Sequence, residues 1–164
     1  MKMSNKYSLG SKRVRDIIDR LILDKYCVHL WLGFGQALFI GFGEEIMPQH
    51  YKGQAAPPAE IHTHFADWYI EGPGLRVSSN ETITADLLSK IKQALIGRKV
   101  VDWRYSRRPQ QFYAEFEGGY VLKIVTWSSD HLTSEQANSD SWCLRLPDGR
   151  YLCVSCTGIV DFSI

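Results

Sequence analysis

Two histidines separated by one residue are the first feature of this sequence that could do chemistry. His62 and His64 stand at positions i and i+2, so in a β-strand both imidazoles point to the same face. Asp67 follows three residues later, and His50 lies upstream. Two imidazoles and a carboxylate suit zinc or iron, with one position left for water. The pattern predicts a divalent-metal site, provided that the strand bends to bring Asp67 round. The alternative is an exposed strand that happens to carry two histidines.

A second cluster combines arginines with aromatic rings. Arg104, Arg107 and Arg108 lie close in sequence to Tyr113, and Trp127 follows in a later polar segment. Arginine and aromatic side chains are typical anchors of protein–protein interfaces, so an acidic protein is the simplest partner for this surface. The alternative is a solvated hairpin turn with no binding role.

Other motifs that carry chemistry are incomplete. Cys153 and Cys156 have CxxC spacing, but they lie in an expected strand, which would place their sulfurs on opposite faces. The glycines of residues 33–35 and 41–43 lack the third glycine of a dinucleotide-binding fingerprint. No Gly-x-Ser-x-Gly elbow is present. The sequence therefore favours a protein without catalytic activity over an enzyme.

Composition narrows the class of protein. The chain has 164 residues, 45% of them hydrophobic and 23% charged, which fits one globular domain. A net charge of +1 gives no general electrostatic case for nucleic acid or anionic membranes. The sequence has neither an apolar run of membrane-spanning length nor the apolar core of a signal peptide. We therefore expect a cytoplasmic protein, in which all four cysteines are reduced thiols.

The first half of the chain begins with an expected amphipathic helix over residues 12–24, followed by a hairpin of residues 27–32 and 37–42. Because residues 30–32 and 38–40 are apolar in succession, we expect them to be buried on both faces. If nothing in the chain covers this run, a homodimer is possible. A long loop over residues 44–60 and a strand over residues 61–70 should follow.

Two hairpins that begin with tryptophan organise the whole chain. Residues 68–78 and 142–155 both carry a proline five positions after the tryptophan and end in Val-Ser. Between them the sequence predicts a helix over residues 84–97, then strands and a polar loop over residues 128–141. After the second hairpin we expect an edge strand over residues 157–164. The predicted fold class is α+β, a mainly antiparallel sheet with two amphipathic helices. Pseudo-repeats at 12–78 and 84–156 are as plausible as a chance similarity.

Residues 84–156 also resemble a group of small uncharacterised bacterial domains that includes immunity proteins of polymorphic toxin systems. The resemblance rests on the segments LIGRKV at 95–100, FEGGYVL at 116–122 and WCLRLPDG at 142–149. These segments mark a helix end and two strand turns rather than a chemical motif. The resemblance implies a protein-binding role and does not imply catalysis.

Two functions follow as expectations. The first is a non-catalytic, immunity-like binding protein whose long loops present side chains such as Tyr51, Trp127 and His131 to a partner. The second is a small metal-binding protein or metal-dependent enzyme that uses the strand of His62 and His64.

Overall fold

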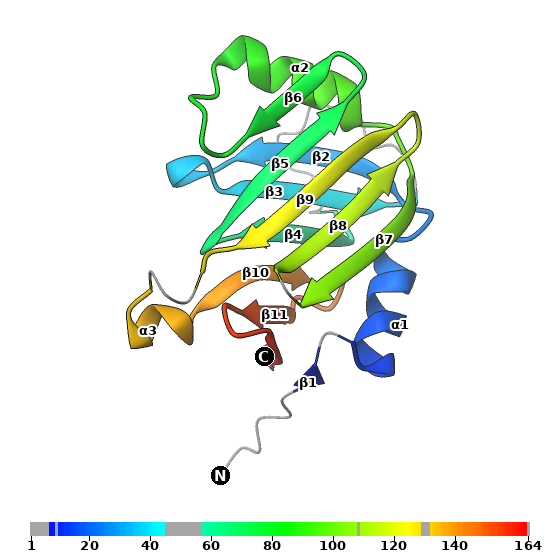
Figure 1. Ribbon diagram of the computed structural model, residues 1–164. Coiled ribbons are helices and arrows are strands. Elements are labelled where there is room, and N and C mark those ends of the chain that lie inside the picture. Colours follow the sequence, from blue (N-terminus) through cyan, green and yellow to red (C-terminus); the bar gives the residue numbers. More distant parts are fainter. Residues whose placement is uncertain (1–6, 9, 45–56, 108, 129–131, 164) are drawn as a thin grey trace.

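The computed structural model describes residues 7–8, 10–44, 57–107, 109–128 and 132–163, and its strands form two antiparallel sheets (Figure 1). The seven-stranded sheet has the spatial order β1 (Tyr7–Ser8), β12 (Ile159–Ser163), β11 (Tyr151–Ser155), β10 (Asp140–Arg145), β4 (Ala59–Thr63), β3 (Leu38–Gly43), β2 (Tyr26–Leu32). The five-stranded sheet has the order β6 (Leu75–Ser78), β5 (Ala66–Gly72), β9 (Tyr120–Thr126), β8 (Gln110–Phe116), β7 (Val100–Arg107). The expected mainly antiparallel fold is confirmed, with more β structure than the sequence indicated.

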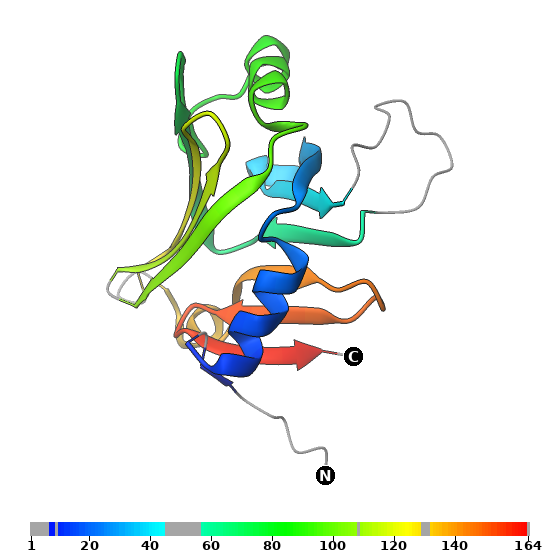
Figure 2. The same ribbon diagram turned by 90° about the vertical axis from the view of Figure 1, so that its right-hand side faces the viewer.

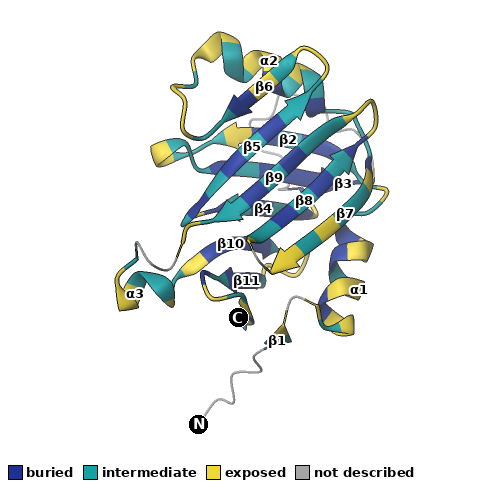
Figure 3. Ribbon diagram, viewed as in Figure 1, coloured by how far each residue is buried: buried dark blue, intermediate teal, exposed yellow. Residues whose placement is uncertain are grey.

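The two sheets face each other and enclose one apolar core. In Figure 1 the five-stranded sheet lies in front and its strands cross the direction of those behind, and Figure 2 shows the two layers from the side. Buried residues alternate with less buried ones along the central strands (Figure 3), because successive side chains of a strand point to opposite faces. The core includes large side chains from both sheets, namely Phe42, Trp68, Phe112, Phe116 and Trp142.

Two helices add their apolar stripes to this core. The helix α1 (Lys12–Leu21) begins at Ser11 and α2 (Ala85–Leu95) begins at Thr84; each of these side chains accepts a hydrogen bond from a backbone N–H of the first turn. The buried residues of α1 include Val14 and Ile18, and those of α2 are Ile91 and Leu95. Both predicted helices are confirmed, each ending two or three residues earlier than expected.

The two halves of the chain are built in the same order. The first half contributes α1, then β2–β4 to the seven-stranded sheet, then the hairpin β5–β6 to the other sheet. The second half contributes α2, then β7–β9 to the five-stranded sheet, then the hairpin β10–β11 to the other. In each half the third strand pairs with the first strand of the other half's hairpin, β4 with β10 and β9 with β5. Trp68 and Trp142 open these hairpins and share one core.

Two expectations about local structure need correction. The single strand expected over residues 61–70 is two strands, because the chain leaves one sheet after Thr63 and enters the other at Ala66. The intervening pair His64-Phe65 contains no glycine or proline to signal this change of sheet. The loop expected over residues 128–141 contains the short helix α3 (Ser134–Ala137), which begins with a capping box formed by Thr133 and Gln136.

Two further observations complete the fold. The expected final edge strand is β12; among the described residues, the two-residue β1 is what pairs with its outer side. Among the described residues, no helix is both long enough and apolar enough to span a membrane.

Candidate functional site

The structure separates the residues that were predicted to bind metal. His62 lies in β4, where its Nε2 is 2.7 Å from Oε1 of Glu60. His64 follows the end of β4 and is exposed. Asp67 lies in β5, in the other sheet, and its Oδ1 accepts a hydrogen bond from the Ser79 hydroxyl. His50 falls outside the described residues. The predicted ligands are not brought together, and a metal site on them stays a prediction.

One group of potential ligands does converge. Within the described part of the chain, only Asp140, Cys143 and Cys153 place three such atoms of histidine, cysteine or acidic side chains within 4.8 Å of one another. Asp140 and Cys143 lie on β10, which pairs with β4, and Cys153 lies on β11, on the other side of β10.

The outer face of the seven-stranded sheet carries a continuous row of rings, which we call the aromatic row: His29, Trp31, Phe39, His62 and Tyr151. Neighbouring ring centroids are 6.5 Å apart for His29–Trp31, 3.9 Å for Trp31–Phe39, 4.5 Å for Phe39–His62 and 5.8 Å for His62–Tyr151. Strand register explains the row, because Trp31 pairs with Phe39 and Phe39 pairs with His62. The row therefore crosses the sheet from β2 to β11.

The row ends at an exposed corner of the molecule. Trp31 keeps 39% of its surface exposed, and Phe34, in the short turn after β2, is fully exposed. The turn is a 3-10 segment, Phe34–Gln36, in which Gly35 and Gln36 both have positive φ. Trp31 and Phe34, three residues apart in the chain, are thus two large apolar side chains exposed to solvent.

Gln36 fixes this corner to the opposite sheet. Its side-chain Nε2 donates to the carbonyl oxygens of Ser79 and Glu81 at 2.9 and 2.6 Å, and its Oε1 accepts from the backbone N–H of Ile83 at 2.8 Å. Its own carbonyl oxygen accepts from Trp68 Nε1 at 2.8 Å. Three of these bonds hold the turn that carries Phe34 against the segment between β6 and α2, and the fourth joins it to Trp68 on β5.

A hydrogen-bonded Glu60–His62 pair supports the middle of the row. The side chains of Glu60 and His62 are only 12% and 15% exposed. Burial alone would raise the pKa of Glu60, but the hydrogen bond and charge of His62, together with Arg145 and His29, outweigh burial and leave this pKa below its usual range. Desolvation lowers the pKa of His29. The row therefore rests on a fixed carboxylate–imidazole contact.

The predicted basic cluster is only partly assembled. The Arg104 guanidinium lies over the Tyr113 ring, 4.9 Å from its centroid, and its Nε donates to Asp102 at 3.2 Å. Arg107 ends β7 and is exposed, and Arg108 lies outside the described residues. Lys123 is the register partner of Tyr113, and Tyr69 is the partner of Lys123 on its other side, so the three line up across β8, β9 and β5.

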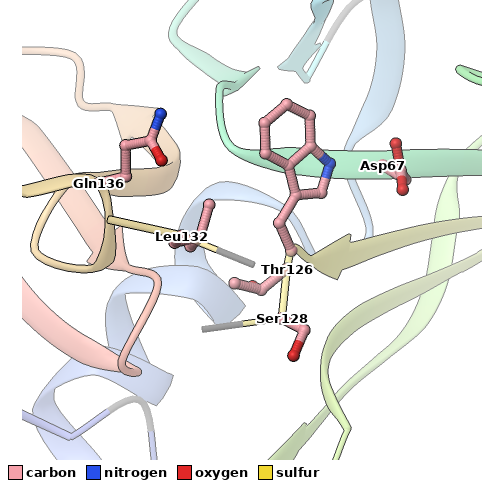
Figure 4. Close-up of a pocket in the computed structure, with 6 residues that line it drawn as sticks. Asp67, Thr126, Ser128, Leu132 and Gln136 are labelled. Atoms are coloured by element: carbon pink, nitrogen blue, oxygen red, sulfur yellow. The ribbon is translucent and has the colours of Figure 1, made fainter. Parts of the chain in front are cut away.

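Trp127 is not part of that basic cluster. It packs edge-on against Phe65, with centroids 5.5 Å apart, where β9 leaves the five-stranded sheet. It lines an open hollow of about 370 Å³ whose other lining residues, shown in Figure 4, are Asp67, Thr126, Ser128, Leu132 and Gln136. The structure thus puts Asp67 beside Trp127 rather than beside His62. Of the loop residues expected to face a partner, Tyr51 and His131 lie outside the described part of the chain.

The expectation of four reduced cysteines is wrong for one pair. Cys143 and Cys153 are directly opposite in the β10–β11 hairpin, with Cα atoms 4.1 Å apart, and form a disulfide. The sequence analysis placed the two cysteines in facing strands. It nevertheless predicted reduced thiols, because that prediction rested on the expected cytoplasmic location and not on the strand geometry. Cys27 and Cys156 are free and buried, as expected. Burial raises the pKa of the Cys27 thiol to about 12, which keeps it protonated.

Trp31, Phe34 and Phe39 are the functional candidates that the sequence did not single out. The prediction that residues 30–32 and 38–40 are buried on both faces is wrong for Trp31, which is exposed, while Leu30 and Ile40 are buried. An alternating pattern was available, because His29 and Trp31 stand two residues apart around Leu30. The alternation was missed because the uninterrupted apolar run was interpreted as a strand buried on both faces.

Comparison with known proteins gives no match: no family model, no curated protein and no solved structure resembles this chain significantly. The function is therefore inferred from the geometry of the chain itself.

Proposed function

We propose that this chain is a non-catalytic protein-binding protein, of the immunity kind that neutralises a toxin, and that its partner docks on the aromatic row and Phe34. One observation carries the proposal: Trp31 is 39% exposed while stacked on Phe39, and the fully exposed Phe34 lies three residues away. Exposed apolar groups that gather at one place are typical of interaction surfaces.

The chemistry of the row suits recognition of an apolar segment on a partner. Aromatic side chains supply large contact areas with little loss of conformational freedom, and tryptophan is enriched among the residues that dominate binding energy. Trp31 is held in place by Phe39 before any partner arrives, and the bonds of Gln36 hold the turn of Phe34. A surface ordered in advance loses less entropy on binding.

The hydrogen-bonded Glu60–His62 pair within the row supports a binding role over catalysis. Glu60 and His62 bond to each other and are mostly buried. A general acid or base must reach a proton on its substrate. This pair is better placed to support the rings on either side of it.

A second surface favours an acidic partner. Arg104 stacks on Tyr113, and Lys123 is the register partner of Tyr113 on the next strand of the five-stranded sheet. Guanidinium groups held on aromatic rings are well suited to carboxylates. Asp102 already pairs with Arg104, so we rank this surface below the aromatic row.

We also propose that residues 12–78 and 84–156 are pseudo-repeats within one domain. The shared order of helix, three-stranded meander and tryptophan hairpin supports this, as does the exchange of hairpins between the sheets. Two halves of this kind would carry two outer faces, which are the two surfaces considered above.

Affinity purification from the native cells tests the binding proposal. The tagged wild type should retain a specific partner that Trp31→Ala/Phe34→Ser loses and that Val101→Ser, an exposed apolar control, keeps. The purified partner must then bind the purified protein, and co-expression should suppress any toxicity of that partner. Loss of binding in Arg104→Glu/Tyr113→Ala alone would move the site to the other sheet. If size-exclusion chromatography shows a wild-type dimer and a monomeric Trp31→Ala/Phe34→Ser variant, the occupant is a second copy.

A further inference from the structure

The β10–β11 hairpin combines two sulfurs with a carboxylate on the outer face of the seven-stranded sheet. Sγ of Cys143, Sγ of Cys153 and a carboxylate oxygen of Asp140 lie within 4.8 Å of one another. The two cysteines are 4% and 8% exposed, whereas Asp140 is exposed. The group is therefore enclosed on the cysteine side and open to water on the aspartate side.

We propose that reduction of the Cys143–Cys153 disulfide turns these three side chains into a Zn²⁺ site. A dithiol reductant transfers two electrons and two protons to the disulfide, leaving two thiols on the protein and a disulfide in the reductant. Zn²⁺ then binds both sulfurs as thiolates, displacing their two protons, and takes the Asp140 carboxylate as its third ligand. Water fills the fourth position of the tetrahedron.

The hairpin holds the ligands together whether or not the sulfurs are bonded. The pairs Trp142–Val154 and Leu144–Leu152 flank the cysteines, and these four side chains are buried in the core. Reduction leaves this ladder intact, so the sulfurs need only rotate about their Cα–Cβ bonds to accommodate Zn–S distances of about 2.3 Å. A register shift between Asp140 and Trp142 accompanies the approach of the carboxylate to the side of Cys143.

The surroundings favour a soft divalent cation. Two thiolates select zinc over magnesium or calcium. The electrostatic neighbours of Asp140 are His64 and Asp161, and Asp161, the register partner of Cys153, contributes negative charge. His62 is the register partner of Cys143, and its Nε2 is already held by Glu60. The site thus uses none of the ligands that the histidine pattern predicted.

The two states belong to different redox conditions. An oxidising compartment keeps the disulfide, and the cytoplasm expected from the sequence would keep the pair reduced and able to bind zinc. The proposal goes beyond partner binding and does not depend on it, since none of the three ligands belongs to the aromatic row, although His62 of that row is the register partner of Cys143.

Metal titration of oxidised and reduced protein tests the site. Untagged protein is reduced with a phosphine, freed of reductant without air and titrated with Co²⁺ and then Zn²⁺. We expect one equivalent to bind the reduced protein, with a thiolate-to-Co²⁺ charge-transfer band that Zn²⁺ removes, and no such band in the oxidised protein. Asp140→Asn should weaken binding by about tenfold or more, and Cys143→Ser should abolish the band. Cys156→Ser should preserve it, since Cys156 lies outside the ligand group.

A second measurement on the wild type guards against variants that fail to fold. Bound Zn²⁺ should protect Cys143 and Cys153 of the reduced protein from alkylation, read by mass spectrometry. Binding of equal strength to the oxidised protein, no binding to the reduced protein, or protection confined to Cys27 and Cys156 would each overturn the proposal. So would loss of the band in Cys156→Ser with retention in Cys143→Ser, because that result would assign the metal to the CxxC pair.

Discussion

Trp31 lies almost flat on Phe39, with the ring centroids 3.9 Å apart and 16° between the ring planes. The two residues are direct cross-strand partners on β2 and β3. Stacking holds the Trp31 ring in place although 39% of its surface faces solvent. An exposed, oriented ring three residues away from the fully exposed Phe34 is what the proposed docking surface requires.

The two classes of tryptophan should differ sharply in their effect on stability. Trp142→Ala removes a side chain that is 1% exposed and should cost about 3–5 kcal/mol of unfolding free energy. Trp31→Ala removes a partly exposed ring and should cost about 1 kcal/mol, mainly the stacking on Phe39. Urea denaturation of both variants measures this. Equal losses would mean that Trp31 is a core residue rather than a binding residue.

Gln36 should contribute more to the free energy of unfolding than a residue in a surface turn usually does. Gln36→Ala removes three side-chain hydrogen bonds to the segment 79–83, each worth about 1 kcal/mol, so we expect a loss of roughly 2–3 kcal/mol. Gln36→Glu keeps an acceptor for Ile83 N–H but places a charge against two carbonyl oxygens, so it should be no more stable than Gln36→Ala. Chemical denaturation measures the loss, and hydrogen exchange at Ile83 should rise with it. An unchanged exchange rate there would contradict the role of the amide.

The Glu60–His62 pair should make stability depend on acid pH. Because the folded-state pKa of Glu60 lies below its ordinary value of 4.5, its contribution is present above pH 4.5 and is lost as pH falls through the folded pKa. Wild type should therefore exceed Glu60→Gln in unfolding free energy at pH 6, and the gap should close as the solution is acidified below pH 4.5. Glu81→Gln, at an exposed position, controls for general acid effects. A gap that stays constant with pH would show that the lowered pKa is absent.

The disulfide should stabilise the fold by a modest amount. It joins residues 10 positions apart, and closing so short a loop is worth about 2–3 kcal/mol. Urea unfolding of oxidised and reduced protein, both with a chelator present, should show this difference. The Cys143→Ser/Cys153→Ser variant should be as stable as the reduced wild type, and reductant should not change its stability. If reductant destabilises the variant as well, its effect lies elsewhere.

Much of the fold could be predicted from local patterns. The helices could be predicted from the apolar stripes at Val14–Ile18 and Ile91–Leu95, and α2 also from its cap Thr84; the cap Ser11 of α1 was not predicted. The hairpins were readable from Gly149 and from the Gly118-Gly119 turn, all with positive φ. The assignment of strands to two sheets was not readable, because His64-Phe65 changes sheets without a turn residue.

The candidate site was harder to predict, because it depends on pairing between distant strands. The ring contact of Phe39 with His62 and the disulfide of Cys143 with Cys153 follow from register, which the sequence of each strand alone does not specify. The histidine spacing was correct for a shared face within one strand, yet β4 ends at Thr63, between the two histidines. Asp67 then enters the other sheet.

The affinity of the purified protein for its purified partner, measured by titration calorimetry, tests the central claim most directly. Loss of a central tryptophan anchor typically costs at least about 2 kcal/mol, which is roughly a thirtyfold increase in Kd. We predict a change of this size for Trp31→Ala and no significant change for Val101→Ser, with both variants folded. An unchanged Kd for Trp31→Ala would contradict the claim that the aromatic row is the docking surface.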